Sequence, residues 1–191
     1  YVLENKERVK GIIITHGHED HIGGLPYLLP HLDAPLYATK LTRGLIEVKL
    51  KEYKLLDHVD LHTIETKDTL TLGPFQVEFF AVCHSIPDGV GLAIETPVGR
   101  VVHSGDFKFD HSPVDGRITD FAKLAEIGGK GVLLLLSDST NSESEGYTPS
   151  EREIQETFEE IFALEKGRII IATFASNISR IQQIIDKASK Y

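Results

Sequence analysis

The sequence contains one cysteine, no methionine and no long apolar segment. The single cysteine, Cys83, excludes an internal disulfide framework and a zinc site built from several thiolates. No apolar run approaches the roughly 20 residues of a membrane-spanning helix, and residues 1–10 lack the apolar region of a secretory signal. We therefore expect a cytoplasmic protein in which histidine and carboxylate bind any metal. Because no methionine stands even at position 1, we also expect the chain to be a fragment.

Positive charge is scarce as well. The chain has 20 lysine and arginine residues against 29 aspartate and glutamate residues, a formal net charge of −9. This balance argues against a protein that binds nucleic acid over its whole surface, because lysine and arginine make the phosphate contacts. It leaves room for a local basic groove, and carboxylates that bind metal ions contribute to the negative charge. The length of 191 residues suffices for one domain, or for one domain and the start of another.

Hydrophobic patterning predicts strands and helices in alternation. The β-branched run at 10–15 predicts a strand buried on both faces, and Gly23 and Gly24 open a short predicted helix through Leu29. Further strands are predicted at 35–38, 69–72, 75–82, 91–96, 100–103, 132–136 and 168–173, and further helices at 39–53, 119–127, 151–164 and 176–190. This mixture predicts a layered α/β sandwich.

The strongest chemical signal is a cluster of histidines directly after the first predicted strand. The segment Thr-His-Gly-His-Glu-Asp-His places His16, His18, Asp20 and His21 within six positions. Zinc accepts imidazole nitrogen and carboxylate oxygen, and so short a loop can direct alternate side chains at two neighbouring metal sites. One ion would take His16 and His18, and the other Asp20 and His21.

Two further candidates follow later strands. His84 comes after the strand predicted at 75–82, and Asp106 comes after the strand predicted at 100–103. Taken alone, His84 is typical of a half-buried loop histidine and Asp106 of a turn residue. Together with the first cluster, they complete a plausible metal-ligand set at the ends of strands.

In this order the ligands resemble those of the metallo-β-lactamase superfamily. Five longer motifs narrow the resemblance: Thr-His-Gly-His-Glu-Asp-His-Ile-Gly-Gly at 15–24, His-Ser-Ile-Pro-Asp at 84–88, Gly-Asp-Phe-Lys-Phe-Asp at 105–110, Leu-Ser-Asp-Ser-Thr-Asn at 136–141 and Ala-Thr-Phe-Ala-Ser-Asn at 172–177. They resemble bacterial ribonuclease J, a family of the beta-CASP branch, in which a second domain is inserted into the metallo-β-lactamase fold.

The resemblance implies an αββα metallo-β-lactamase sandwich at 1–148 that lacks its first strands, and a truncated start of a beta-CASP domain at 149–191. It implies hydrolysis of single-stranded RNA with two zinc ions, from the 5′ end or internally, in RNA processing and decay. Manganese would suit a carboxylate-rich site nearly as well. The family also implies a dimer or tetramer, or pairing with a related ribonuclease J subunit.

The resemblance also assigns roles to residues. His16, His18 and His84 would bind the first ion, Asp20 and His21 the second, and Asp106 would bridge both. Asp20 would also orient the attacking water. Asp138 matches the first signature acid of the branch and would pair with a histidine beyond residue 191 to help protonate the leaving oxygen.

Several polar residues allow two interpretations. Phosphate contact and loop capping are equally good roles for the small side chains Ser85, Ser139, Thr140, Ser176 and Asn177, and Lys108 is a solvated lysine or a positive charge near the metals. We interpret His103 and Cys83 as core residues and place His31, His58, His62 and His111 on the surface.

Three other functions compete with a ribonuclease. The first is another hydrolase of the same fold that acts on DNA, a lactam or an ester, because one fold supports many chemistries. The second is a non-catalytic subunit of a ribonuclease J complex, against which the intact ligand set argues. The third is a redox protein with iron at the same ligands, which its iron content would reveal.

Overall fold

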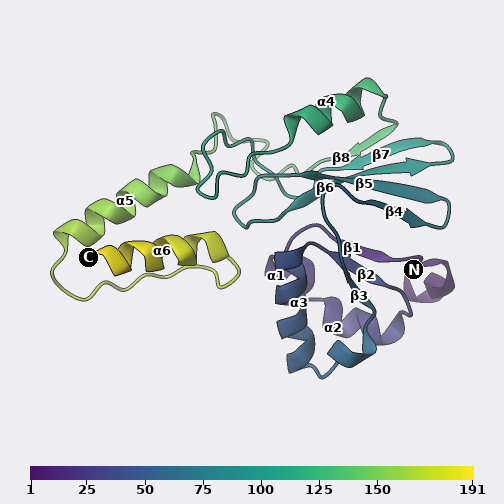
Figure 1. Ribbon diagram of the computed structural model, residues 1–191, viewed down its shortest axis with the longest axis horizontal. Helices are drawn as coiled ribbons and strands as arrows, with labels where there is room; N and C mark the ends of the chain where they lie inside the picture. The colour runs from purple at the N-terminus through teal and green to yellow at the C-terminus, as the bar shows by residue number, and fades with distance from the viewer.

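The computed structural model describes all residues 1–191, and it places two sheets face to face between helices (Figure 1). The smaller sheet contains three parallel strands in the order β1-β2-β3, with bounds β1 Ile12–Ile14, β2 Leu36–Ala38 and β3 Leu61–Thr63. The larger sheet has the order β4-β5-β6-β7-β8, with bounds β4 Thr69–Leu72, β5 Phe75–Ala81, β6 Val90–Thr96, β7 Gly99–His103 and β8 Leu134–Leu136. Its pairs are antiparallel except β7 and β8, which are parallel.

Helices cover the outer faces of the two sheets. The 3-10 helix η1 spans Leu3–Arg8. The other helices on the side of the small sheet are α1 Glu19–Ile22, α2 Leu25–Leu28, η2 Leu29–His31, α3 Lys40–Glu52 and η3 Leu56–His58. α4, at Phe121–Gly129, accompanies the large sheet (Figure 1). None of the helices combines the length and the apolarity that crossing a membrane requires.

Three apolar clusters define the order of the layers. The first packs α1 to α3 against β1 and β2 and includes Ile14, Leu36, Ile46 and Leu50. The second lies between the sheets, where Val77 and Phe79 of β5 meet Ile13 and Tyr37 of the small sheet. The third packs Phe80, Val102 and Ile127 between the large sheet and α4. Because successive β5 side chains point to opposite faces, this one strand contributes to two clusters. The layer order is therefore αββα, which confirms the predicted fold class.

The last two helices form a separate pair beside the sandwich (Figure 1). α5 spans Glu151–Leu164 and α6 spans Ile178–Lys190. Arg180 near the start of α6 contacts Glu151 at the start of α5, and Lys187 further along α6 contacts Glu159 further along α5. The two helices therefore run parallel. Side-chain caps begin both helices, because Ser150 accepts from Arg152 N and Asn177 accepts from Arg180 N.

Several sequence predictions of local structure need correction. The helix expected from Gly23 begins earlier, because His18 ends the extended segment and the acidic Glu19 and Asp20 form the first turn of α1. The strand expected at 168–173 does not form, and Ile170 is exposed. β3 lies at the start of the segment 61–103, for which β structure is expected, but the sequence does not single it out as a separate strand. β8 is shorter than the predicted strand 132–136, and all its side chains are exposed.

Candidate metal centre

Three strand ends bring the candidate ligands together. His16 and His18 follow β1, His84 follows β5, and Asp106 follows β7. Asp20 and His21 lie in α1, which begins directly after His18. Both sheets therefore contribute ligands, and the side chains are anchored to rigid strands.

Two glycines allow the ligand-bearing loops to approach their neighbours. Gly105, directly before Asp106, has φ +63°, and a Cβ on it would lie 2.9 Å from Val90 O. A Cβ on Gly17, between His16 and His18, would lie 2.5 Å from Leu45 Cδ1. Glycine at both positions thus removes a steric conflict, and at Gly105 it also permits the left-handed backbone.

The first group of donors consists of three histidines. His18 Nδ1 lies 3.1 Å from His16 Nε2 and 3.1 Å from His84 Nε2. The ring nitrogens of His16, His18 and His84 all lie within 4.8 Å of one another. Three imidazole nitrogens at this spacing can surround one small cation.

The second group overlaps the first. It consists of His16, His21 and Asp106, whose donor atoms also lie within 4.8 Å of one another. Asp106 Oδ2 is 3.4 Å from His21 Nε2 and 3.8 Å from both His16 Nε2 and His84 Nε2. The Asp106 carboxylate therefore belongs to the second group and also lies close to two histidines of the first, so one residue can serve both.

Asp20 lies at the margin of this arrangement. Its Oδ2 is 3.5 Å from His21 Nε2, but its side chain is 78% exposed and belongs to neither donor group. The structure thus brings five of the six predicted ligands together and leaves Asp20 next to the second group, on the solvent side.

Burial keeps the central histidines uncharged. His16 is 1% exposed, and burial, with the neighbouring His21, His84 and His18, lowers its pKa to about 3. Burial also lowers the pKa values of His18 and His84, and the Asp20 carboxylate opposes the effect at His18. At neutral pH these rings are therefore in the form that binds metal ions.

Hydroxyl groups contact the ring nitrogens that face away from the centre. Thr15 Oγ1 lies 3.2 Å from His16 Nδ1, and Ser85 Oγ lies 3.4 Å from His18 Nε2. A proton donated from either ring to its hydroxyl partner leaves the opposite nitrogen free for a metal. Ser85, a candidate phosphate contact in the sequence, thus contacts a candidate ligand instead.

Asp138 lies directly after β8, next to the loop of Asp106. Its backbone N donates to Ser104 Oγ at 2.9 Å, and its Oδ1 accepts from Thr140 N at 2.8 Å. Burial alone raises the pKa of this carboxyl, but hydrogen bonds from Thr140 and Phe107 outweigh burial and bring the pKa below its usual range. Asp138 is therefore ionised at neutral pH.

A cavity of about 490 Å³ opens beside the candidate metal ligands. Its lining consists of His18, Glu19, Asp20, Ser85, Phe174, Ser176 and Asn177. The cavity therefore joins the α1 region to the segment before α6. Phe174 is 85% exposed. Sequence reasoning missed Phe174 and Glu19, although Phe174 lies within the motif at 172–177.

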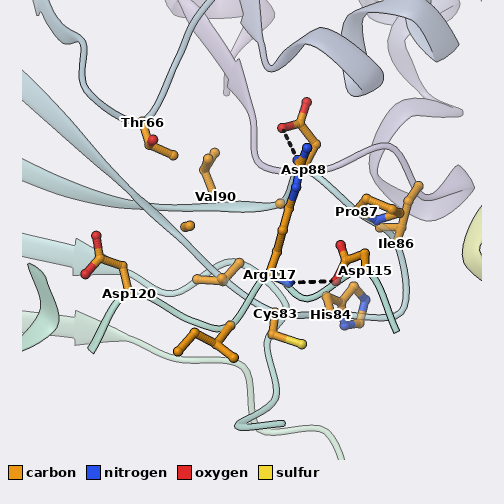
Figure 2. Close-up of a pocket in the computed structure, with 14 residues that line it drawn as sticks. Thr66, Cys83, His84, Ile86, Pro87, Asp88, Val90, Asp115, Arg117 and Asp120 are labelled. Carbon is orange, nitrogen blue, oxygen red and sulfur yellow. Dashed lines mark hydrogen bonds and ion pairs between the residues drawn. The ribbon is translucent and has the colours of Figure 1, made fainter. Parts of the chain in front are cut away.

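A second cavity, of about 420 Å³, meets the centre only through His84 (Figure 2). Arg117 extends along it toward Asp88, with Nη1 3.5 Å from Asp88 Oδ1. Cys83 is buried in its wall, as expected for a core residue. Outside the centre, His103 Nδ1 accepts from Gly105 N at 3.0 Å, and His62 pairs with Asp60.

Comparisons with known proteins agree with this arrangement. The family described as "Beta-lactamase superfamily domain" matches residues 2–130, and "Ribonuclease J, beta-CASP domain" matches residues 166–191. The whole chain is 45% identical to ribonuclease J of Thermus thermophilus and 47% identical to ribonuclease J of Synechocystis sp.. It spans only 35% and 30% of those relatives' lengths. The predicted resemblance is confirmed.

One solved structure supports the fold. A protein of unknown function from Enterococcus faecalis superposes with a TM-score of 0.67 at 19% identity, over 92% of this chain and 44% of that one. At this identity the likeness concerns the fold alone.

Proposed function

The chain belongs to the β-lactamase superfamily, and from this premise we propose that it forms the metal-binding part of a ribonuclease that hydrolyses RNA phosphodiesters with two metal ions. The observation that carries the proposal is the pair of overlapping donor groups, which share His16 and the second of which contains Asp106. Similarity to ribonuclease J over the whole chain supports RNA as the substrate class.

The donors fit two divalent cations. His16, His18 and His84 would bind one ion, His21 would bind the second with Asp20, and Asp106 would bridge both. Neutral imidazole and carboxylate are ligands that zinc takes in proteins, and the buried Cys83 belongs to neither donor group. Zinc is the proposed metal, and manganese is the alternative. When bound, such ions supply Lewis-acid chemistry: they lower the pKa of a water molecule and offset charge on phosphoryl oxygens.

The protein's own residues would prepare this centre for reaction. Asp20 is exposed at the margin of the second group, so its carboxylate can orient a water without giving up its place beside His21. Thr15 and Ser85 would keep two ligand rings in the required orientation. No side chain of the centre need attack phosphorus itself.

Asp138 would assist departure of the leaving group indirectly. Because its pKa lies below the usual range, it carries no proton to donate at neutral pH. An ionised carboxylate can instead accept a hydrogen bond from a protonated histidine and orient that ring toward the leaving oxygen. The partner histidine proposed for Asp138 lies beyond residue 191.

The cavity next to His18 would receive the RNA. Its exposed Phe174 offers a face on which a base can stack, a contact that tolerates any base. Ser176 lies in the same wall and can contact sugar or phosphate, whereas Asn177 already caps α6. The net charge of −9 favours a confined binding groove over broad surface contact.

The proposal extends to organisation and location. We assign residues 1–148 to a metallo-β-lactamase domain and 149–191 to the start of a beta-CASP domain, a division that the two separate family matches support. We also propose a cytoplasmic enzyme of RNA processing or decay that cuts from the 5′ end, internally or both ways. It would act as a homodimer, a homotetramer or with a related subunit.

The decisive test pairs metal content with substrate choice. The full-length protein is analysed for zinc, manganese and iron, and is then given a 5′-monophosphorylated single-stranded RNA and its DNA equivalent. We expect two zinc or manganese ions per chain and preferential cleavage of RNA. Preferential cleavage of DNA would indicate another nuclease of the fold. Two bound metal ions without cleavage of RNA or DNA would indicate a different hydrolase or a non-catalytic subunit. Bound iron would indicate redox chemistry.

A further inference from the structure

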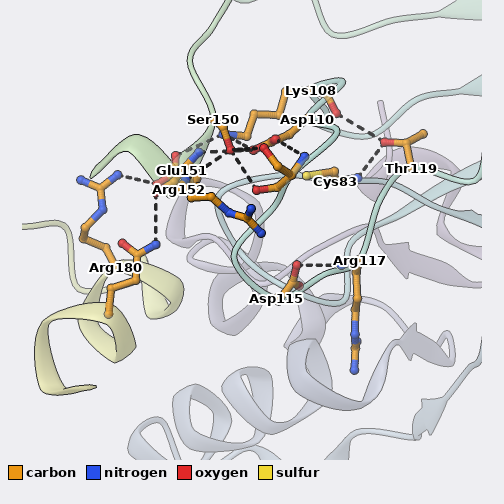
Figure 3. Close-up of polar contacts among 12 residues, drawn as sticks. Cys83, Lys108, Asp110, Asp115, Arg117, Thr119, Ser150, Glu151, Arg152 and Arg180 are labelled. Carbon is orange, nitrogen blue, oxygen red and sulfur yellow. Dashed lines mark hydrogen bonds and ion pairs between the residues drawn. The ribbon is translucent and has the colours of Figure 1, made fainter. Parts of the chain in front are cut away.

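A buried threonine hydroxyl connects the two loops that carry His84 and Asp106. Thr119 is 1% exposed. Its Oγ1 accepts a hydrogen bond from Cys83 N at 2.9 Å and donates one to Lys108 O at 3.3 Å (Figure 3). The Thr119 hydroxyl therefore accepts one hydrogen bond and donates another, and its two backbone partners lie in different loops.

A third hydrogen bond closes the connection. Lys108 N donates to Cys83 O at 2.8 Å. Both backbone polar groups of Cys83 are thus bonded by the segment that follows Asp106, one through Thr119 and one directly. Asp120, the residue after Thr119, adds a further hydrogen bond between the two segments, because its N donates to Ala81 O at 3.0 Å.

These contacts lie close to the candidate ligands along the chain. Cys83 directly precedes His84, and Lys108 is two residues after Asp106. His84 Nε2 and Asp106 Oδ2 are 3.8 Å apart, although β5 and β7 are not neighbours in the sheet. β6 lies between the two strands and pairs with both, so no ladder hydrogen bond joins β5 to β7 directly. The hydrogen bonds around Thr119 join the two ligand-bearing loops directly.

We propose that Thr119 is a positioning residue that sets the spacing of His84 and Asp106 for metal binding. The inference rests on the proposed metal-dependent function. Thr119 makes no hydrogen bond with either ligand; it acts through the backbone of Cys83 and Lys108. Groups that orient metal ligands in this way commonly change metal affinity by about 10–100-fold when they are lost.

Thr119→Val tests the inference, because valine preserves the shape of threonine and removes only the hydroxyl. In the full-length protein we expect about a 10–100-fold loss of zinc affinity, measured by competition with a chromogenic chelator. We also expect a changed visible absorption spectrum of the cobalt-substituted protein, which reports ligand geometry directly. Thr119→Ser keeps the hydroxyl and should restore both properties toward those of the wild type.

Thr42→Val is the matched control. Thr42 is 0% exposed and accepts a hydrogen bond from Thr39 Oγ1 at 3.1 Å, so this change also removes a buried, bonded hydroxyl from the same domain. Urea unfolding of the metal-free variants measures the general loss of stability. Equal losses of zinc affinity in Thr42→Val and Thr119→Val would overturn the inference, as would wild-type affinity in Thr119→Val or an unrescued loss in Thr119→Ser.

A substitute variant and a separate cleavage assay complete the test. If Thr119→Val does not fold, Thr119→Ala replaces it, because alanine also removes the hydroxyl and adds no group that binds zinc; a lowered zinc affinity then supports the inference and an unchanged one refutes it. RNA cleavage is assayed separately. If the wild-type protein binds zinc but cleaves no RNA, the proposed ribonuclease function is refuted. The zinc affinity of the variants still decides the role of Thr119.

Discussion

Acid should destabilise the metal-free protein because His16 of the candidate metal centre is buried without a charge. In the folded chain the pKa of His16 is about 3, below the ordinary value of 6.5 that applies when the chain is unfolded. Between these values the unfolded state binds a proton that the folded state does not. The contribution of His16 is therefore complete above pH 6.5 and is lost as the pH falls toward 3.

The size of the effect follows from the two pKa values. At pH 6 the loss from His16 is about 1 kcal/mol, and at pH 5 it is about 2 kcal/mol. The lowered pKa values of His18 and His84 add to the loss in the same direction. Because a domain is stable by only about 5–15 kcal/mol, such a loss is easily measured.

Urea unfolding of the chelator-treated protein at pH 7, 6 and 5 measures the effect. His16→Gln removes the titrating ring and should flatten the dependence on pH, whereas His31→Gln changes an exposed histidine and should not. Equal free energies of unfolding at pH 7 and pH 5, or an undiminished slope in His16→Gln, would refute the reasoning. Bound metal should enlarge the slope, since protons compete with the ion for the same nitrogens.

Four other changes give distinct results. His18→Ala removes a nitrogen of the first donor group, so metal analysis should show about one ion fewer per chain and RNA cleavage should be lost. Asp138→Asn should lower kcat by about 10²–10⁴-fold while metal content stays at the wild-type level. Phe174→Ala removes about 1–3 kcal/mol of base stacking, so KM for RNA should rise about tenfold or more with little change in kcat. Gly105→Ala forces an alanine to φ +63° against Val90 O and should reduce the free energy of unfolding by about 1 kcal/mol or more, as measured by urea titration.

The ligand cluster could be predicted from the sequence because its chemistry is local. His16, His18 and His21 lie within six residues after an apolar strand, and a strand end fixes where such a loop begins. His84 and Asp106 became candidates because each also follows a strand. Their meeting depends on the order of strands in the sheet, which the family resemblance supplied and which strand periodicity alone does not.

The failures concern partners that a sequence pattern does not specify. The run Arg-Ile-Ile-Ile-Ala-Thr at 168–173 has the composition of a buried strand, but no strand lies beside it, and without a neighbour its backbone gains no ladder. β8 has the opposite character: it pairs with β7, yet its Leu134 and Leu135 remain 49% and 60% exposed. A pattern thus predicts what a segment can do, and pairing or packing depends on which other segments are near.

Thr119 extends the same argument to the site itself. Its hydroxyl meets Cys83 N across 36 residues, and nothing in the local sequence distinguishes it from any other threonine before a helix. The pKa of His16 likewise depends on burial and on charge repulsion from three other histidines, one of them 68 residues away. Ligand identity is therefore encoded locally, whereas ligand spacing and protonation are properties of the packed sandwich. A variant that preserves every ligand can still lose the metal if it disturbs that packing.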